Sequence, residues 1–162
     1  MLCLKRKIMP TKWLTEEKSL RLIKSAVYGR LATCGDDNQP YITPLNFVLI
    51  EKNIYFHCGF EGRKIDNLTT NPAVCFEVSR HGKLYAAPNA QNFSMRYWSV
   101  LVFGRATKVN DREKKLAVMN KLMEKYASDY AYIPLTLDDM KSCNLIEIQI
   151  EKITGKVSVD PK

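Results

Sequence analysis

Short apolar segments separated by polar turns dominate the hydrophobic pattern between Arg30 and Cys58. The segments read LAT, YITPLNFVLI and IYFHC, and the turns between them read GDDNQP and EKN. Runs of this length that are bounded by turn residues predict three antiparallel strands. Pro44 lies inside the second run, and because proline cannot donate to a sheet ladder, it predicts an edge or a bulge there.

Three further segments predict strands. Residues 73–78 form an apolar run, and residues 96–109 predict one long strand or two strands bent at Gly104. Residues 145–153 alternate, with isoleucines on one face and Glu147, Gln149 and Glu151 on a face expected to be wet. Residues 85–95 show neither the alternation of a strand nor the apolar face of a helix, and they predict an exposed loop. His81, next to Gly82, is expected in a surface turn.

Helices are predicted in three places. The first begins after Thr15 as its cap and ends near Gly29, and a short one over residues 61–70 is closed by the Asn71-Pro72 step. A third begins at Asn110. Its expected inner stripe consists of Leu116, Met119, Leu122, Met123 and Tyr126. Together these elements predict a mainly β fold, a six- or seven-stranded antiparallel barrel with helices outside it, as a single domain over residues 1–162.

The charge balance narrows the possible partners. The chain has 162 residues, 46% of them hydrophobic, and a net charge of +8, which suits nucleic acid, an acidic membrane surface or small phosphorylated ligands. The basic residues are scattered among 17 acidic ones, so a nucleic-acid interface is not expected. The longest apolar runs are too short for a membrane-spanning helix, so no membrane partner is expected.

The cysteines point to a reducing compartment. There are five, Cys3 included, with no C-x-x-C pair, so neither a disulfide framework nor a metal site is expected. The start MLCLKRKIMP lacks the apolar centre of a secretory signal. The expected location is therefore the cytoplasm.

The Gly62-Arg63-Lys64 step is the strongest candidate for ligand chemistry. It follows a predicted strand and opens a predicted helix, where backbone N–H groups, a forked guanidinium and a point charge suit a phosphate. Taken alone, such a step is also typical of a solvated loop.

Longer stretches carry a family resemblance. GRLATCGDDNQPYITPLNF, NPAVCFEV and YWSVLVFGRATKVND follow one another within about residues 15 to 125. In that order they resemble the flavin-binding split-barrel superfamily, which contains pyridoxamine-phosphate-oxidase-like proteins and the nitroimidazole-resistance proteins. The resemblance implies an FMN-binding split barrel and a homodimer with a flavin at each of two equivalent interface clefts.

The resemblance also implies a set of site residues. Main-chain groups of the second strand would hydrogen-bond the isoalloxazine ring, and these residues are Pro44, Leu45, Asn46 and Phe47. His57 and Cys58 would lie near the ribityl or phosphate end, with Gly62, Arg63 and Lys64 on the phosphate. Tyr97, Trp98 and Ser99 would approach the flavin from the partner subunit.

Two of these assignments have alternatives. Tyr97 and Trp98 also suit interface or core aromatics. A histidine at a strand end is by default structural, but the nitroimidazole-resistance proteins carry one at the place of His57, which makes it the catalytic candidate as a proton donor or substrate guide.

The leading functional hypothesis is a flavin-dependent reductase. NADH or NADPH would reduce the flavin, which would reduce a nitroaromatic, 5-nitroimidazole-like or other small acceptor. No G-x-G-x-x-G step occurs, so the nicotinamide would bind transiently. A non-catalytic flavin or haem carrier or redox sensor is the alternative. Pyridoxamine-phosphate oxidation is not expected, because the end ITGKVSVDPK lacks the basic, tryptophan-containing segment in which those oxidases resemble one another. The sequence does not distinguish FMN from FAD as the cofactor.

Overall fold

A computed structural model describes residues 11–158, so residues 1–10, Cys3 among them, and residues 159–162 lie outside the account that follows. Eight strands form one antiparallel sheet in the order β3-β2-β6-β7-β8-β5-β4, with β1 pairing beside β8. The strands are β1 Thr11–Leu14, β2 Gly29–Cys34, β3 Pro40–Leu45, β4 Val48–Ile50, β5 Asn53–Cys58, β6 Ala73–Tyr85, β7 Ser94–Val109 and β8 Asn144–Ser158. The helices are α1 Glu16–Ser25, α2 Arg63–Thr70 and α3 Arg112–Tyr126, with short 3-10 turns η1 Ala90–Asn92 and η2 Asp139–Lys141.

The sheet curls into a barrel around one apolar core. Buried side chains from five strands and α1 meet in that core, among them Ile23, Leu31, Phe56, Phe76 and Ile148, all fully buried. A second, smaller cluster lies between α3, β4, β5 and β8. The antiparallel barrel predicted from the sequence is confirmed, with more strands than the six or seven expected.

Two strands were not predicted as separate elements: β1, and β4, which a break between Leu45 and Val48 separates from β3. The sequence predicts one strand over residues 41–50, but β3 and β4 lie at opposite ends of the sheet order. Between them Phe47 is buried, with its ring edge-on to Phe76 at 4.8 Å between centroids. Packing of this ring turns the chain away from β2, and β3 is left as a sheet edge, as Pro44 predicts.

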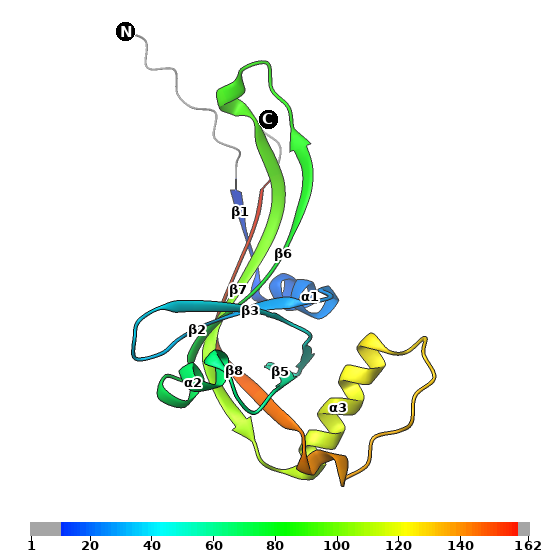
Figure 1. Ribbon diagram of the computed structural model, residues 1–162. Coiled ribbons are helices and arrows are strands. Elements are labelled where there is room, and N and C mark those ends of the chain that lie inside the picture. Colours follow the sequence, from blue (N-terminus) through cyan, green and yellow to red (C-terminus); the bar gives the residue numbers. More distant parts are fainter. Residues whose placement is uncertain (1–10, 159–162) are drawn as a thin grey trace.

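Two long strands, β6 and β7, project beyond the barrel as a hairpin (Figure 1). We call residues 79–99 the arm and the rest of the described chain the body. The loop predicted over residues 85–95 is confirmed for residues 86–93, where η1 lies, whereas Tyr85 ends β6 and Ser94 and Met95 begin β7. The predicted turn at His81 and Gly82 is wrong, because both residues belong to β6, next to a register shift against β7.

Gly104 marks a second register shift. Phe103 pairs with Lys152 and Gly104 pairs with Ile150, so β8 has one extra residue there. A Cβ atom at Gly104 would lie 2.1 Å from the Gln149 carbonyl oxygen. The close approach of the two backbones requires glycine, and it accounts for the predicted bend.

The wet face predicted for residues 145–153 is wrong at Glu147, which is buried. Its carboxylate accepts hydrogen bonds from Tyr55 Oη at 2.7 Å, Asn53 Nδ2 at 2.8 Å and Lys114 Nζ at 2.8 Å. Burial raises the pKa of Glu147, but the hydrogen bonds from Lys114 and Tyr55 and the charge of Lys114 outweigh it, so the pKa lies below its ordinary value. A buried carboxylate is stable here because it has three hydrogen-bond partners, which come from β5 and α3.

The observed ends of the helices agree in part with the predicted ones. Thr15 caps α1 as predicted, but the helix ends at Ser25 and not near Gly29. α2 ends before Pro72 as predicted. The cap of α3 lies one residue later than expected, because Asp111 and not Asn110 accepts from the Lys114 N–H at 2.7 Å, and the helix itself begins at Arg112.

The inner face of α3 differs in part from the predicted stripe. Leu122 is buried, whereas Leu116, Met119, Met123 and Tyr126 are half-buried, and the other buried residues are Lys115 and Val118. Lys115 is buried because its Nζ donates to the carbonyl oxygens of Cys143 and Met140. Across residues 11–158 no helix is both long and apolar enough to span a membrane.

Candidate ligand site at the start of α2

The start of α2 is an uncapped helix end with two cationic side chains. Gly62 occupies the N-cap position at φ 106°, and no side chain caps the helix there. Space is not the reason for glycine, since an added Cβ atom would meet nothing within 4 Å, so the positive φ is what requires it. Without a capping side chain, the first N–H groups of the helix can bind an anion.

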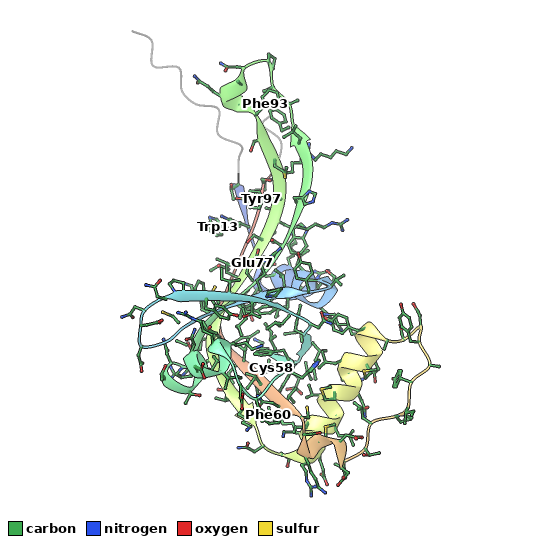
Figure 2. The ribbon with its side chains drawn as sticks, viewed as in Figure 1. Trp13, Cys58, Phe60, Glu77, Phe93 and Tyr97 are labelled. Carbon is green, nitrogen blue, oxygen red and sulfur yellow. The ribbon has the colours of Figure 1, made fainter. Side chains whose placement is uncertain are left out.

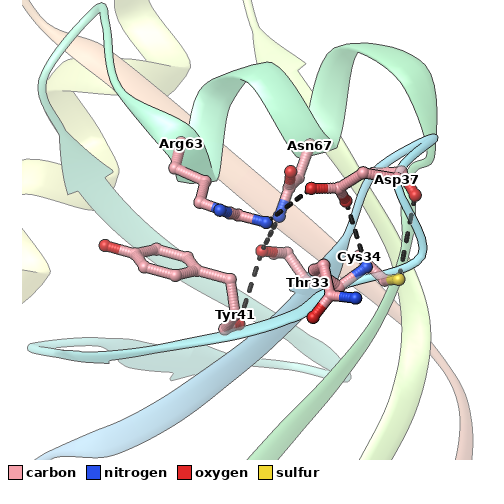
Figure 3. Close-up of polar contacts among 8 residues, drawn as sticks. Thr33, Cys34, Asp37, Tyr41, Arg63 and Asn67 are labelled. Carbon is pink, nitrogen blue, oxygen red and sulfur yellow. Dashed lines mark hydrogen bonds and ion pairs between the residues drawn. The ribbon is translucent and has the colours of Figure 1, made fainter.

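Arg63 lies over the β2–β3 hairpin (Figure 3). Its guanidinium donates to Asp37 Oδ2 at 2.7 Å and lies 5.8 Å from the centre of the Tyr41 ring. Both charged side chains are about half exposed, 46% and 54%, so this pair contributes little net stability. The guanidinium can therefore exchange Asp37 for a phosphate oxygen at small cost.

Asn67 locks the same helix against β2. Its Nδ2 donates to Thr33 Oγ1 at 3.0 Å in a buried contact (Figure 3). A Cβ atom at Gly35 would lie 2.7 Å from Asn67 Oδ1, so the hairpin can approach the helix only with glycine there. This anchor, which orients the Arg63 side of the helix, was not predicted from the sequence.

His57 and Cys58 lie at the end of β5, which leads directly into the Gly62 turn. His57 is exposed, whereas Cys58 is half-buried and its Sγ accepts from Asn144 Nδ2 at 3.6 Å. Burial raises the pKa of the Cys58 thiol, although the nearby charge of Lys64 opposes the shift. Cys58 is therefore a neutral thiol near pH 7 and not an activated nucleophile.

Lys64 is half-buried beside the same strand. Its Nζ lies 5.3 Å from the centre of the Phe56 ring, which is fully buried in the core. Lys64 thus lies over the barrel and Arg63 over the hairpin, one on each side of the uncapped turn.

Phe47 is clamped by α3. Its N–H donates to Tyr126 Oη, and its carbonyl oxygen accepts from Tyr126 Oη and Lys125 Nζ, each at 3.0 Å. Burial lowers the pKa of Lys125 to about 8. Because the main-chain groups of Phe47 are already paired, only Pro44, Leu45 and Asn46 of the segment predicted to line a flavin ring remain as candidates for that contact. The hydrogen bonds from α3 to Phe47 were not predicted from the sequence.

Tyr97, Trp98 and Ser99 lie elsewhere, on the arm. Figure 2 shows Tyr97 on the arm and Cys58 in the body. Ser158 Oγ accepts from the Tyr97 N–H at 2.7 Å, and Trp98 is half-buried against the core. One chain therefore brings together the residues of β5 and α2 next to the β3 hairpin, and it leaves residues 97–99 on a different surface.

Trp98 lines two hollows of that surface. One, of about 500 Å³, also involves Arg80, Tyr97 and Val157, and the other, of about 660 Å³, reaches Val27 and Tyr28 after α1. Both hollows are open to solvent.

Comparison with known proteins gives the family. Residues 15–157 match the family described as pyridoxamine 5'-phosphate oxidase, and the chain belongs to that family. No curated protein matches the chain.

Solved structures share the fold at low identity. A candidate 5-nitroimidazole antibiotic resistance protein from Bacteroides thetaiotaomicron is 24% identical, with a TM-score of 0.79 over 91% of this chain and 87% of that one. An FAD-binding protein from Mesorhizobium loti is 24% identical, with a TM-score of 0.65 over 93% and 100%. An FAD- and haem-binding protein from Mycobacterium smegmatis is 15% identical, with a TM-score of 0.80 over 94% and 75%. The split-barrel fold expected from the sequence is confirmed.

Proposed function

We propose that this protein is a flavin-binding oxidoreductase that reduces nitroaromatic or other small acceptors with electrons from NADH or NADPH. The observation that carries the proposal is the uncapped, cationic start of α2 beside the open β3 edge, in a fold shared with proteins named for FAD binding. Such a helix start suits the phosphate that every flavin nucleotide carries.

The residues present fit a flavin phosphate. The first N–H groups of α2 are available to phosphate oxygens, and Arg63 can bind two of them once it leaves Asp37. Lys64 adds a second positive charge on the other side of the turn. The same phosphate site serves FMN, our first candidate, and FAD, the cofactor in the names of two neighbours.

The ring system would lie along the edge of β3, at Pro44, Leu45 and Asn46, where no further strand pairs within residues 11–158. A second copy of the chain would bring its Tyr97, Trp98 and Ser99 to the other side of the ring. This arrangement makes the protein a homodimer, and it gives a role to arm residues that are far from α2 within one chain.

The chain's own residues would bind and orient, and the flavin, when bound, supplies the electron-transfer chemistry. His57 is exposed at the end of β5, where its ring can donate a proton to an acceptor as it is reduced. The nicotinamide would bind transiently over the open edge, since the fold contains no dinucleotide-binding βαβ unit across the described strands.

Flavin binding is tested by titrating the purified protein with FMN and with FAD, followed by ring fluorescence, and by mass analysis of any small molecule released on denaturation. Replacing both Arg63 and Lys64 with alanine should weaken binding by about 2–4 kcal/mol, the scale of losing charge-assisted hydrogen bonds. The matched control is Arg112→Ala with Lys121→Ala on α3, which removes the same charges from an exposed helix face. Equal affinity in the two double variants would contradict the phosphate assignment.

A flavin or haem carrier without turnover is the second candidate, and the named FAD and haem binding of the Mycobacterium smegmatis neighbour favours it. Rapid oxidation of NADH or NADPH with a 5-nitroimidazole acceptor, lost in His57→Gln, supports the reductase. Tight cofactor retention with no turnover over a panel of donors and acceptors supports the carrier.

A further inference from the structure

The connection between α3 and η2, residues 127–138, exposes large apolar side chains. Tyr130 is 73% exposed, Ile133 is 91% exposed, and Tyr132 is exposed as well. Pro134 follows Ile133, and because proline disfavours helical backbone at the residue before it, the tip of this connection stays extended. Figure 1 shows the segment standing out beyond α3, away from the arm. We call it the α3–η2 loop.

The α3–η2 loop is acidic, although the chain as a whole is basic. Residues 126–140 include three acidic side chains and no lysine, arginine or histidine, whereas the whole chain has a net charge of +8. Asp138 and Asp139 are engaged by neighbours in the loop and in η2. Asp129 is exposed and accepts from the adjacent Ser128 Oγ at 3.3 Å. An apolar segment with an exposed carboxylate suits a partner surface that is apolar and cationic.

The junction of the arm with the body offers such a surface. The hollow of about 660 Å³ at this junction is lined by Val27 and Tyr28 after α1 and by Arg80 and Trp98 of the arm. Val27 is 72% exposed, and Tyr28 is 48% exposed. Arg80 is exposed too, and no carboxylate of residues 11–158 pairs with it. The junction hollow is therefore complementary to the α3–η2 loop in both polarity and charge.

The proposed dimer brings the loop of one copy to the hollow of the other. Tyr126, the last residue of α3, bonds both main-chain groups of Phe47 at 3.0 Å, so the loop begins beside the end of β3. Trp98 of a second copy is proposed to approach that same strand edge across the flavin ring. Because Trp98 also lines the junction hollow, the hollow of the second copy would lie next to the loop of the first.

We propose that the α3–η2 loop of each copy fills the junction hollow of the other. Tyr132 and Ile133 pack against the exposed apolar wall of the hollow, and Asp129 pairs with Arg80. In a two-fold dimer this contact occurs twice, once for each loop. The inference rests on the proposed function, because it uses the position that the flavin site gives to Trp98, and it adds a second surface by which two copies recognise each other.

Charge reversal tests the pairing, with the dimer dissociation constant measured by sedimentation equilibrium. Asp129→Arg and Arg80→Asp should each weaken the dimer at least about tenfold, since each places like charges together at both contacts. An equal mixture of the two variants should regain the wild-type constant, because a mixed dimer has opposite charges at both contacts. Recovery on mixing cannot arise from a contact within one chain. Glu113→Arg, on an exposed turn of α3, changes the net charge as Asp129→Arg does and should leave the constant unchanged.

The apolar part of the contact is tested separately. Ile133→Ser should weaken the dimer about tenfold, because a large side chain that the second copy would bury is lost. Its far-UV circular dichroism should stay that of the wild type, since Ile133 is exposed within one chain. Unchanged dimer affinity in Ile133→Ser would overturn the proposal.

The outcomes of the charge experiment separate this contact from the proposed function. A dimer that either charge reversal leaves intact, or one that mixing does not restore, would overturn the contact alone. A wild type that is monomeric at micromolar concentration would overturn the contact together with the proposed homodimer. Recovery on mixing in a protein that binds neither FMN nor FAD would support the contact and contradict only the proposed function.

Discussion

The body and the arm are built from the same two strands, yet their side chains differ at a sharp boundary. Val78 of β6 and Val100 of β7 pair with each other, and both are buried in the barrel core. Beyond this pair, β6 continues with exposed residues from Ser79 to Leu84. The pairing of β6 with β7 therefore extends beyond the point where the buried apolar core ends.

The difference shows which part of the molecule is complete in one chain. The body buries a core of large apolar side chains, although it also exposes others such as Ile42 at 62% and Ile133 at 91%. No residue of the arm is buried, and the arm exposes Leu84 at 60%, Phe93 at 50% and Met95 at 46%. Contiguous exposed apolar side chains on a regular element are typical of an interaction surface. The contrast supports the proposed homodimer, in which the body folds each subunit and the arm meets the other one.

The largest effect is expected in the body core. Phe76→Ala removes a fully buried ring that contacts Phe47 and fills the space left by Gly29, and it should lower the free energy of unfolding by about 3–5 kcal/mol. Phe103→Ala is the matched control, because Phe103 pairs with the neighbouring Cys75 but is 39% exposed. Denaturant unfolding measures both, and equal losses would mean that the core does not lie where the burial pattern places it.

The buried carboxylate of Glu147 comes next. Glu147→Gln should cost about 1.5–3 kcal/mol near neutral pH, the worth of hydrogen bonds to a charged group. Its folded pKa lies below the unfolded value, so the stability it contributes is complete above about pH 5 and is lost as pH falls through the lowered pKa. The measurement is the urea midpoint between pH 7 and pH 3. The wild type should lose more stability over that range than Glu147→Gln, and Glu113→Gln, on the exposed first turn of α3, should follow the wild type.

The Phe47 clamp should have a smaller and local effect. Tyr126→Phe removes the hydroxyl that bonds both main-chain groups of Phe47 and should lower stability by about 1–2 kcal/mol. Hydrogen exchange of the Phe47 amide should accelerate, because its acceptor is gone. Tyr130→Phe, on a tyrosine that is 73% exposed, should change neither quantity. An unaltered Phe47 exchange rate would show that the ring packing, and not the clamp, sets the break between β3 and β4.

Features that depend on contacts between residues close in the sequence were predicted, and features that depend on contacts between distant residues were not. The β-rich pattern, the caps at Thr15 and near Asp111, the bend at Gly104 and the helix after Gly62 depend on neighbours in sequence, and all of them were predictable. The break after Leu45 was not, because YITPLNFVLI reads as one strand and only Phe76 and Tyr126, far along the chain, set the turn.

The same reason applies to buried polar residues. Glu147 falls on the polar side of a clean alternation, and its burial depends on Tyr55 and Lys114 from two other elements. Asn144 and Asn67 likewise have partners 34 to 86 residues away. Alternation reports only which residues share a face. The local Gly62-Arg63-Lys64 step therefore marked the candidate α2 site, but no local pattern marked Asn67, which anchors α2 to β2.

The smallest effect on folding, and the sharpest test of the contrast, is expected on the arm. Leu84 and Met95 pair across the hairpin and both are exposed, so Leu84→Ser with Met95→Ser should change the unfolding free energy of one chain by no more than about 0.5 kcal/mol each. The same double variant should shift sedimentation from dimer to monomer at micromolar concentration, since apolar contacts of the arm are what a second copy would bury. Lys83→Ser, on the same strand, is the control and should sediment as the wild type does. A loss of stability as large as that of Phe76→Ala would show that the arm belongs to the folding unit of the body, and an unchanged dimer would place the subunit contact elsewhere.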